Sequence, residues 1–149
     1  MIKALIVDDE AKARTSLHKL LKRYCQDVKV VATAESVEEA FEHIQNFKPQ
    51  LVFLDIEMPE ENGFQLLERF KNPNFEIIFT TAYADYALKA FRYAALDYLS
   101  KPIDFRLLIE AIGRFKEKQE VKFTHERMSL LLENLNNSPK TFEKIALST

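Results

Sequence analysis

The chain has 149 residues, 47% of them hydrophobic and 30% charged, the balance of a soluble globular protein with one domain and a core. A formal net charge of −2 argues against a chain built mainly to coat nucleic acid or an anionic membrane. The single cysteine, Cys25, cannot form an internal disulfide, and no apolar stretch approaches the roughly 20 residues of a membrane span. The start, MIKALIVDDE, is unlike a signal peptide, so we expect a cytoplasmic protein with no membrane partner.

The first part of the chain alternates apolar runs with helical patterns. Ile2–Val7 predicts a short buried strand, and apolar residues at helical spacing from Ala13 to Tyr24 predict a helix after it. The valine-rich run Val28–Ala34 predicts a second strand. Ser36 and Glu39 form a capping-box pattern, which predicts that a second helix begins there.

The same alternation continues to the last predicted strand. Leu51–Leu54 predicts the third strand, followed by a short helix that carries Phe64–Phe70. Glu76–Thr80 predicts the fourth strand, Tyr86–Tyr93 an alanine-rich helix, and Asp97–Ser100 the fifth strand.

Asp104 predicts the cap of a last helix. Five apolar residues fall on one side of this helix: Phe105, Leu108, Ile109, Ile112 and Phe115. Five strand–helix units with strands apolar on both faces predict a parallel sheet covered on each side, a doubly wound α/β sandwich. Ligands of such sheets bind outside the carboxyl ends of the strands.

That rule brings five chemical groups to one edge of the sheet. Asp8 and Asp9 follow the first strand, Asp55 the third, Thr81 the fourth and Lys101 the fifth. Carboxylate oxygens suit Mg²⁺, and beside such a cation one carboxylate can attack a phosphoryl group to give an acyl phosphate. The hydroxyl and the ammonium suit the phosphoryl oxygens.

Taken singly, each of these residues also has an ordinary interpretation. Asp8 and Asp9 could cap the first helix, Thr81 could be a strand-end hydroxyl, and Lys101 could be a solvated turn residue. These alternatives stay open for each residue alone, but chance does not account well for all five groups at one edge.

Four motifs carry a resemblance to a known family. "IVDDE", "FLDIEMPEENG", "TTAY" and "DYLSKP" stand in the order and spacing of the response-regulator receiver domain of two-component signalling, which residues 1 to 118 resemble. The resemblance implies a flavodoxin-like (βα)5 fold with sheet order 2-1-3-4-5. It also implies that Asp55 accepts a phosphoryl group from a histidine kinase.

The resemblance further implies the cofactor and its ligands. Mg²⁺ would be bound by Asp9 directly, by Asp8 through water, by Asp55, and by the backbone carbonyl of Glu57. An Mg²⁺-dependent phosphohydrolase is disfavoured, because such enzymes place a second aspartate where this chain has Glu57. We expect self-phosphorylation from phosphodonors and autodephosphorylation, and no other enzyme activity.

The remaining implied roles concern switching. Lys101 would pair with the phosphoryl oxygens, its bond to Pro102 would be cis, and Thr81 would move toward the phosphoryl group. Tyr98 would turn inward with it, although an aromatic residue on a core strand is more often packing. Ala94 stands where the family has Gly or Asn, which tolerate left-handed backbone angles, so the loop could follow a different path.

The C-terminal segment of the sequence predicts which output domain follows the receiver. We expect three segments: a receiver domain at 1–120, a linker helix and loop at 121–139, and the start of a truncated LytTR-type DNA-binding domain at 140–149. The amphipathic stretch Phe123–Leu135 either extends the last helix, packs on a partner or folds back on the receiver. "NNSP" predicts a break, and Lys144–Thr149 the opening strand of the next domain.

We therefore expect a response regulator that dimerises on phosphorylation through the face formed by its fourth predicted helix (Tyr86–Tyr93), its fifth strand and its last helix, here called the helix 4, strand 5 and helix 5 face. DNA would be bound only by the missing output domain, which would regulate transcription. The alternative is a stand-alone receiver that acts by protein–protein interaction.

Overall fold

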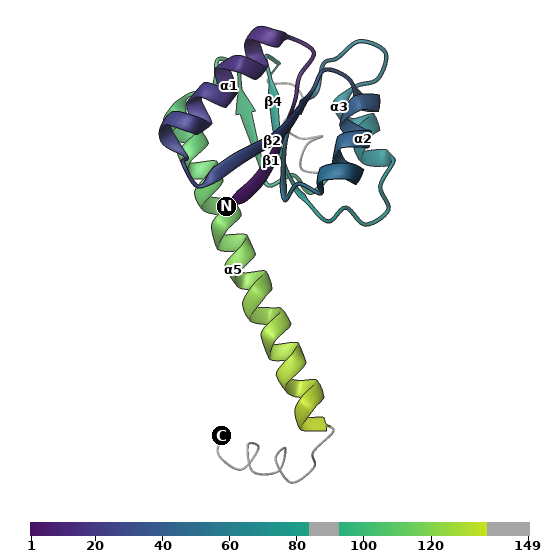
Figure 1. Cartoon of the computed structure of the whole chain (residues 1–149), viewed down its shortest axis with the longest axis vertical. Helices are drawn as coiled ribbons and strands as arrows, with labels where there is room; N and C mark the ends of the chain where they lie inside the picture. Colours follow the sequence, from purple (N-terminus) through teal and green to yellow (C-terminus); the bar gives the residue numbers. More distant parts are fainter. Residues whose placement is uncertain (84–92, 137–149) are drawn as a thin grey trace. The chain divides into compact units, whose positions relative to one another are not determined.

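The computed structural model of the chain describes residues 1–83 and 93–136 (Figure 1). It has two units, Met1–Gly113 and a second unit that begins at Arg114, and we describe each by itself. The helices and strands are β1 (Ile2–Val7), α1 (Ala11–Tyr24), β2 (Val28–Ala34), α2 (Val37–Phe47), β3 (Leu51–Asp55), α3 (Gly63–Glu68), β4 (Glu76–Thr81), β5 (Asp97–Ser100) and α5 (Phe105–Asn136). The helix predicted at Tyr86–Tyr93 lies, apart from Tyr93, outside the described residues.

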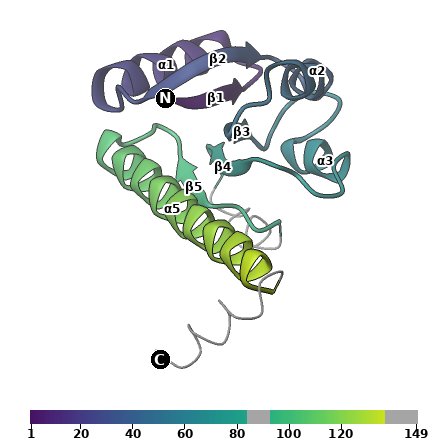
Figure 2. The same cartoon turned by 60° about the horizontal axis from the view of Figure 1, so that its bottom comes forward.

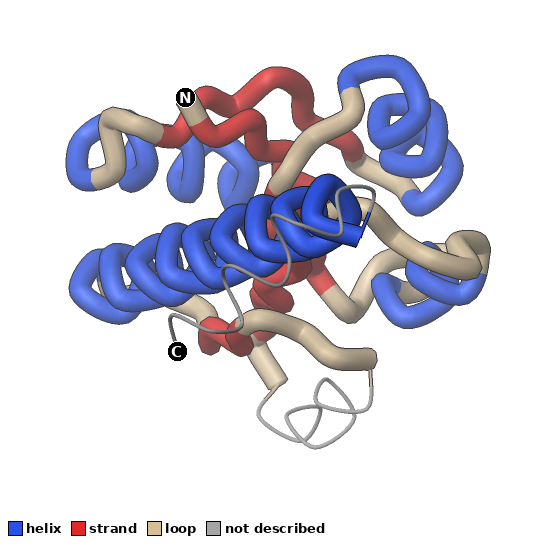
Figure 3. Tube along the Cα trace, turned by 90° about the horizontal axis from the view of Figure 1, so that it is seen from below, coloured by secondary structure: helices blue, strands red, loops and turns tan. Residues whose placement is uncertain are grey.

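The five strands form one parallel sheet in the order β2-β1-β3-β4-β5, which confirms the predicted fold class and strand order. Figure 2 shows α1 and the first turns of α5 on one face of this sheet and α2 and α3 on the other. Figure 3 shows the same two layers of helices around the sheet, seen from below. The order reverses between β1 and β3, so the carboxyl ends of these two strands flank the expected binding edge.

Both faces of the sheet are buried because successive strand residues point in opposite directions. Leu5 and Val7 of β1 belong to the core cluster that includes residues of α2 and α3. Ala4 and Ile6, which alternate with them, are equally buried. The near-continuous apolar strands read from the sequence are therefore explained by helices on both sides.

Polar side chains fix where several helices begin. The Ser36 hydroxyl accepts the N–H of Glu39 at 3.1 Å, which confirms the predicted start of α2. The Glu39 carboxylate lies 3.3 Å from His43 Nε2. Asp104 Oδ1 accepts the N–H of Arg106 at 2.8 Å, so the predicted cap of the last helix is also confirmed.

Three predicted boundaries differ from the structure. β3 and β4 each run one residue further than predicted, so Asp55 and Thr81 belong to the strands themselves. α3 ends at Glu68, and the predicted helical position of Phe70 is wrong. The N–H groups of Arg69 and Phe70 bond to carbonyls three residues back, which tightens the chain out of the α-helix.

The buried side of α5 also differs from the predicted one. Within the first unit the buried residues are Leu108, Ala111 and Ile112, whereas Ile109 is 43% exposed. Each step along a helix turns about 100°, so Ile109 points well away from Leu108. Phe105 is partly exposed and stacks on Tyr24 with ring centroids 4.4 Å apart.

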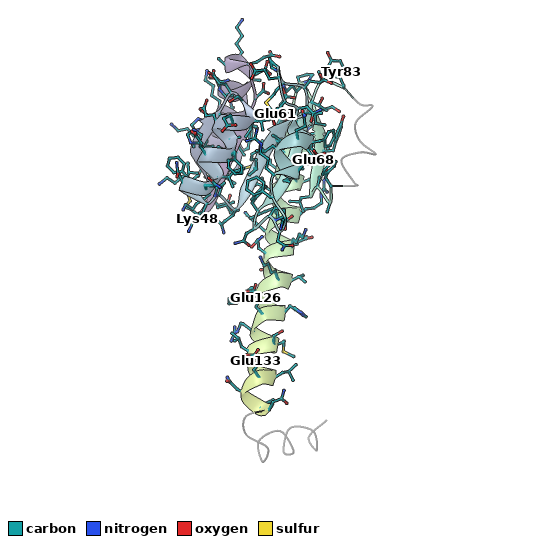
Figure 4. The ribbon with its side chains drawn as sticks, turned by 90° about the vertical axis from the view of Figure 1, so that its right-hand side faces the viewer. Lys48, Glu61, Glu68, Tyr83, Glu126 and Glu133 are labelled. Carbon is teal, nitrogen blue, oxygen red and sulfur yellow. The ribbon has the colours of Figure 1, made fainter. Side chains whose placement is uncertain are left out.

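The second unit begins within α5, which runs without a break from Phe105 to Asn136. The amphipathic stretch predicted at Phe123–Leu135 therefore extends this helix, and several of its large apolar side chains are exposed. Figure 4 labels Glu126 and Glu133 along it. Among the described helices, α5 included, none is long and apolar enough to cross a bilayer. The break at "NNSP" and the strand predicted at Lys144–Thr149 lie outside the described residues, except for Asn136.

Candidate phosphoryl-acceptor site

The candidate site lies at the carboxyl edge of the sheet. In Figure 4 Glu61, which follows β3, and Tyr83, which follows β4, lie toward this edge, whereas Lys48, which precedes β3, lies toward the opposite one. The parallel register brings the strand ends together, since Asp55 pairs with Thr80 and Thr81 pairs with Ser100. The sheet alone therefore supplies most of the convergence predicted from the sequence.

Asp8 is held from several sides at the end of β1. It is 3% exposed, its N–H donates to the Ala34 carbonyl at 3.0 Å, and its Oδ1 accepts the N–H of Glu10 at 2.9 Å. The residue at the cap position of α1 is Glu10, and no side chain caps this helix. The interpretation of Asp8 and Asp9 as helix caps is therefore wrong.

Lys101 joins Asp8 to Asp55. Its ammonium lies 2.6 Å from Asp8 Oδ2 and 3.5 Å from Asp55 Oδ2. Burial lowers the Lys101 pKa, but the hydrogen bond to Asp8 and the charges of both aspartates outweigh burial, and the pKa is raised overall. Lys101 therefore stays charged, and it is not a solvated turn residue.

Asp55 carries the largest electrostatic perturbation of the site. It is 3% exposed, and burial, together with the charge of Asp8, raises its pKa from 3.8 to about 7, although Lys101 acts in the opposite direction. A second positive charge in the pocket would relieve the repulsion between these carboxylates.

The oxygens available to a cation lie close together beside Asp8. One carboxylate oxygen from each of Asp8, Asp9 and Glu10 lies within 4.8 Å of the others. Three hard oxygen donors fit Mg²⁺, which keeps several of its waters. Glu10 was not among the predicted ligands. The expected ligand Asp55 is not one of these three residues, but it is joined to Asp8 by the Lys101 ammonium, which contacts both aspartates.

Thr81 and Tyr98 both bond to the backbone of Tyr83. Thr81 is fully buried, and its Oγ1 accepts the N–H of Tyr83 at 3.1 Å. The Tyr98 hydroxyl donates to the Tyr83 carbonyl, while its ring packs against the core cluster. Packing and hydrogen bonding therefore coexist at Tyr98. The N–H of Lys101 donates to the Thr81 carbonyl at 2.7 Å, and the predicted cis bond between Lys101 and Pro102 is confirmed.

Comparison with known proteins identifies the family to which this fold belongs. The family model described as "Response regulator receiver domain" matches residues 4–113. The chain belongs to this family. Sensory transduction protein LytT of Bacillus subtilis is 44% identical over 119 residues, which cover 78% of this chain and 49% of that protein. Transcriptional regulatory protein BtsR of Salmonella typhi is 37% identical over 136 residues, covering 90% of this chain and 54% of that protein.

The receiver therefore spans about half the length of the curated relatives it matches. Solved receiver structures agree with the fold. The REC domain of AraT, a response regulator from Geobacillus stearothermophilus, has a TM-score of 0.73 at 37% identity, covering 81% of this chain and 97% of that one. The response regulator domain of Thermotoga maritima CheB has a TM-score of 0.66 at 30% identity, covering 78% and 95% respectively.

The loop after Asp55 is shaped by residues that the sequence did not single out. Asn62 and Gln65 form a complete capping box at the start of α3. The N–H of Gly63 donates to the Ile56 carbonyl at 2.9 Å, and a Cβ on Gly63 would stand 2.6 Å from the Asp55 carbonyl oxygen. Glycine is thus needed here for close approach to the strand that carries Asp55. The N-x-x-Q spacing was the available signal for the cap.

Two more features lie near the site, one at Ala94, for which the sequence made a prediction, and one at Arg69, for which it made none. Ala94 has a φ of 55°, so it adopts the left-handed conformation, and the idea that the loop avoids it is wrong. Arg69, which directly follows α3, contacts the loop after β3, with its guanidinium 2.6 Å from Glu61 and 3.0 Å from Glu38 of α2.

Proposed function

We propose that this receiver is the phosphoryl-accepting part of a two-component response regulator, with Asp55 as the acceptor and a sensor histidine kinase as the donor. The observation that carries the proposal is the Asp55 carboxylate, which is 3% exposed and has the Lys101 ammonium 3.5 Å from its Oδ2. A desolvated carboxylate is suited to attack phosphorus, and the ammonium can balance charge on the phosphoryl oxygens.

The proposed step transfers a phosphoryl group from a phosphohistidine nitrogen to a carboxylate oxygen of Asp55. The O–P bond forms as the P–N bond breaks, and the bonding electron pair remains on the imidazole, which takes up a proton from solvent. Asp55 must be ionised to react, so the effect of Lys101, which lowers the Asp55 pKa, favours the reactive form. Acetyl phosphate would give the same acyl phosphate, and water would later hydrolyse it.

The proposed cation site serves this transfer. We assign direct binding of Mg²⁺ to Asp9, water-mediated binding to Asp8, and the remaining protein ligands to Asp55 and the Glu57 carbonyl. Glu10 is an alternative ligand, because its oxygen belongs to the same close group as those of Asp8 and Asp9. Bound Mg²⁺ would neutralise negative charge on the phosphoryl oxygens.

The proposed switch runs through Tyr83. If Thr81 turns toward a phosphoryl group on Asp55, its Oγ1 leaves the Tyr83 N–H, and the loop that accepts the Tyr98 hydroxyl is released. Tyr98 lies on β5, so this change would reach the helix 4, strand 5 and helix 5 face. We propose that the altered face forms a homodimer.

The proposed output is DNA binding by a LytTR-type domain beyond this chain, in the cytoplasm. The names of the relatives, LytT "sensory transduction protein" and BtsR "transcriptional regulatory protein", support regulation of transcription. The segment boundaries 1–120, 121–139 and 140–149 remain predictions. The second candidate is a stand-alone receiver that acts by protein–protein interaction, which the exposed apolar residues of α5 favour.

Intact-mass analysis after incubation with acetyl phosphate tests the acceptor. We expect one phosphoryl adduct with Mg²⁺, much less with EDTA, and none on Asp55→Asn. Asp27→Asn, which precedes β2 at the opposite edge of the sheet, is the matched control and should react like the wild type. An undiminished adduct on Asp55→Asn would contradict the proposal.

A further inference from the structure

Arg14 of α1 reaches back to the end of β1. Its Nη1 donates to the Asp8 carbonyl at 2.7 Å, and its side chain is only 19% exposed. Its Nη2 lies 3.9 Å from Glu35, which follows β2. The guanidinium is therefore held between the ends of two neighbouring strands, beside the candidate acidic site.

The bond from Arg14 completes the anchoring of Asp8. The N–H of Asp8 bonds to the Ala34 carbonyl, its carboxylate bonds to Glu10 and Lys101, and its carbonyl accepts from Arg14. The Asp8 carbonyl belongs to the peptide that leads into Asp9. Arg14 thus restrains the rotation of the peptide that sets the direction of the Asp9 side chain.

We propose that Arg14 is a positioning residue for cation binding, which holds the Asp8–Asp9 peptide so that the two carboxylates face one Mg²⁺. The inference rests on the proposed function, because it concerns the same acidic pocket. Groups that orient metal ligands typically change metal affinity by about 10- to 100-fold when removed. Arg14 bonds to backbone rather than to a ligand atom, so we expect an effect near the lower limit.

A positioning role and a simple charge effect predict opposite signs. Arg14 is a permanent positive charge near the cation site, so by electrostatics alone its removal should strengthen Mg²⁺ binding. If Arg14 positions the Asp8–Asp9 peptide, its removal should weaken binding. Lys12, exposed on the same first turns of α1, provides the matched control for charge.

The test compares the 149-residue wild type with Arg14→Met, Arg14→Lys and Lys12→Met. The first readout needs no phosphodonor: the rise in unfolding temperature is measured as a function of Mg²⁺ concentration and fitted to give the Mg²⁺ dissociation constant. The second is the rate of phosphorylation by acetyl phosphate as a function of Mg²⁺. We expect Arg14→Met to raise the Mg²⁺ dissociation constant and the Mg²⁺ concentration that half-saturates the phosphorylation rate, each by about tenfold. The rate at saturating Mg²⁺ should return toward that of the wild type.

Arg14→Lys should recover part of the affinity, because one donor can still reach the carbonyl, and Lys12→Met should bind Mg²⁺ as well as the wild type or better. Unchanged or tighter binding by Arg14→Met would overturn the inference. If Arg14→Met does not fold, Arg14→Lys decides: weaker Mg²⁺ binding with a normal saturated rate supports the inference, and wild-type binding overturns it. If the phosphorylation rate of the wild type does not depend on Mg²⁺, the proposed function is overturned as well.

Discussion

Replacing Asp55 with asparagine in the metal-free protein should stabilise it, by an amount that depends on pH. Asp55 is 3% exposed beside Asp8, and its pKa is raised from 3.8 to about 7. Asparagine keeps the shape of the side chain and removes the charge. The Lys101 ammonium keeps its 2.6 Å contact with Asp8, so the substitution does not leave it without a carboxylate partner.

The direction in which the free energy of unfolding changes with pH follows from proton binding by Asp55. A carboxyl group with a raised pKa in the folded state holds its proton there while the unfolded chain has already lost it. The free energy of unfolding therefore falls as pH rises from about 4 to about 7, and the full penalty is present above pH 7. One pKa unit corresponds to about 1.4 kcal/mol, so the pKa shift of Asp55 from 3.8 to about 7 sets an upper limit of about 4 kcal/mol on the loss of folding stability. Relaxation and water entry reduce this limit, so we expect about 2–3 kcal/mol.

Urea unfolding in EDTA at pH 5 and at pH 8 provides the assay. Asp55→Asn should exceed the wild type in free energy of unfolding by about 2–3 kcal/mol at pH 8 and by less at pH 5, where the wild-type carboxyl is mostly protonated. The Asp27→Asn control should show no such pH-dependent gain. A stability difference that is the same at both pH values, or a destabilised variant at pH 8, would refute the electrostatic reasoning.

Three further outcomes follow from the same structure. Gly63→Ala should lower the free energy of urea unfolding by about 1–3 kcal/mol and slow phosphorylation, because its Cβ would stand 2.6 Å from the Asp55 carbonyl oxygen. At Gly113 an added Cβ would meet no atom within 4 Å beyond the neighbouring helix backbone, so Gly113→Ala should raise this free energy by about 0.5–1 kcal/mol. Ala94→Gly should raise stability by about 0.5–1 kcal/mol in thermal unfolding, since relief of the left-handed strain exceeds the entropy cost, whereas Ala95→Gly should lower it. Thr81→Val and Tyr98→Phe both act on the Tyr83 backbone, so a double-mutant cycle should give a coupling of about 0.5 kcal/mol, and strict additivity would contradict the shared contact.

Much of the fold followed from local patterns. Apolar runs predicted all five strands to within one residue, because strands covered on both faces consist mainly of apolar residues, with Lys3 and Lys29 at exposed positions. The predicted site followed from one topological rule, since the carboxyl ends of parallel strands lie at one edge and four of the five strands end at or beside an aspartate, a threonine or a lysine. Lys101 therefore met Asp8 and Asp55 as expected.

The rest depended on contacts that span the chain in three dimensions. Arg14 lies six residues from Asp8, and only the turn from β1 into α1 brings its guanidinium to that carbonyl. The requirement for Gly63 arises from close approach to the Asp55 backbone rather than from a positive φ, and the sequence alone does not reveal such a contact. Ile109 was assigned to the buried side because it is apolar, yet burial on a helix depends on the direction of each side chain as well as on its polarity.

The most direct test of the central claim is to locate the phosphoryl group. The protein phosphorylated by acetyl phosphate in Mg²⁺ is reduced with borohydride, which converts an aspartyl phosphate to homoserine, and is then mapped by peptide mass spectrometry. The account predicts homoserine at position 55 and an unchanged aspartate at positions 8 and 9. Homoserine at position 8 or 9 in the wild type, with Asp55 unmodified, would contradict it.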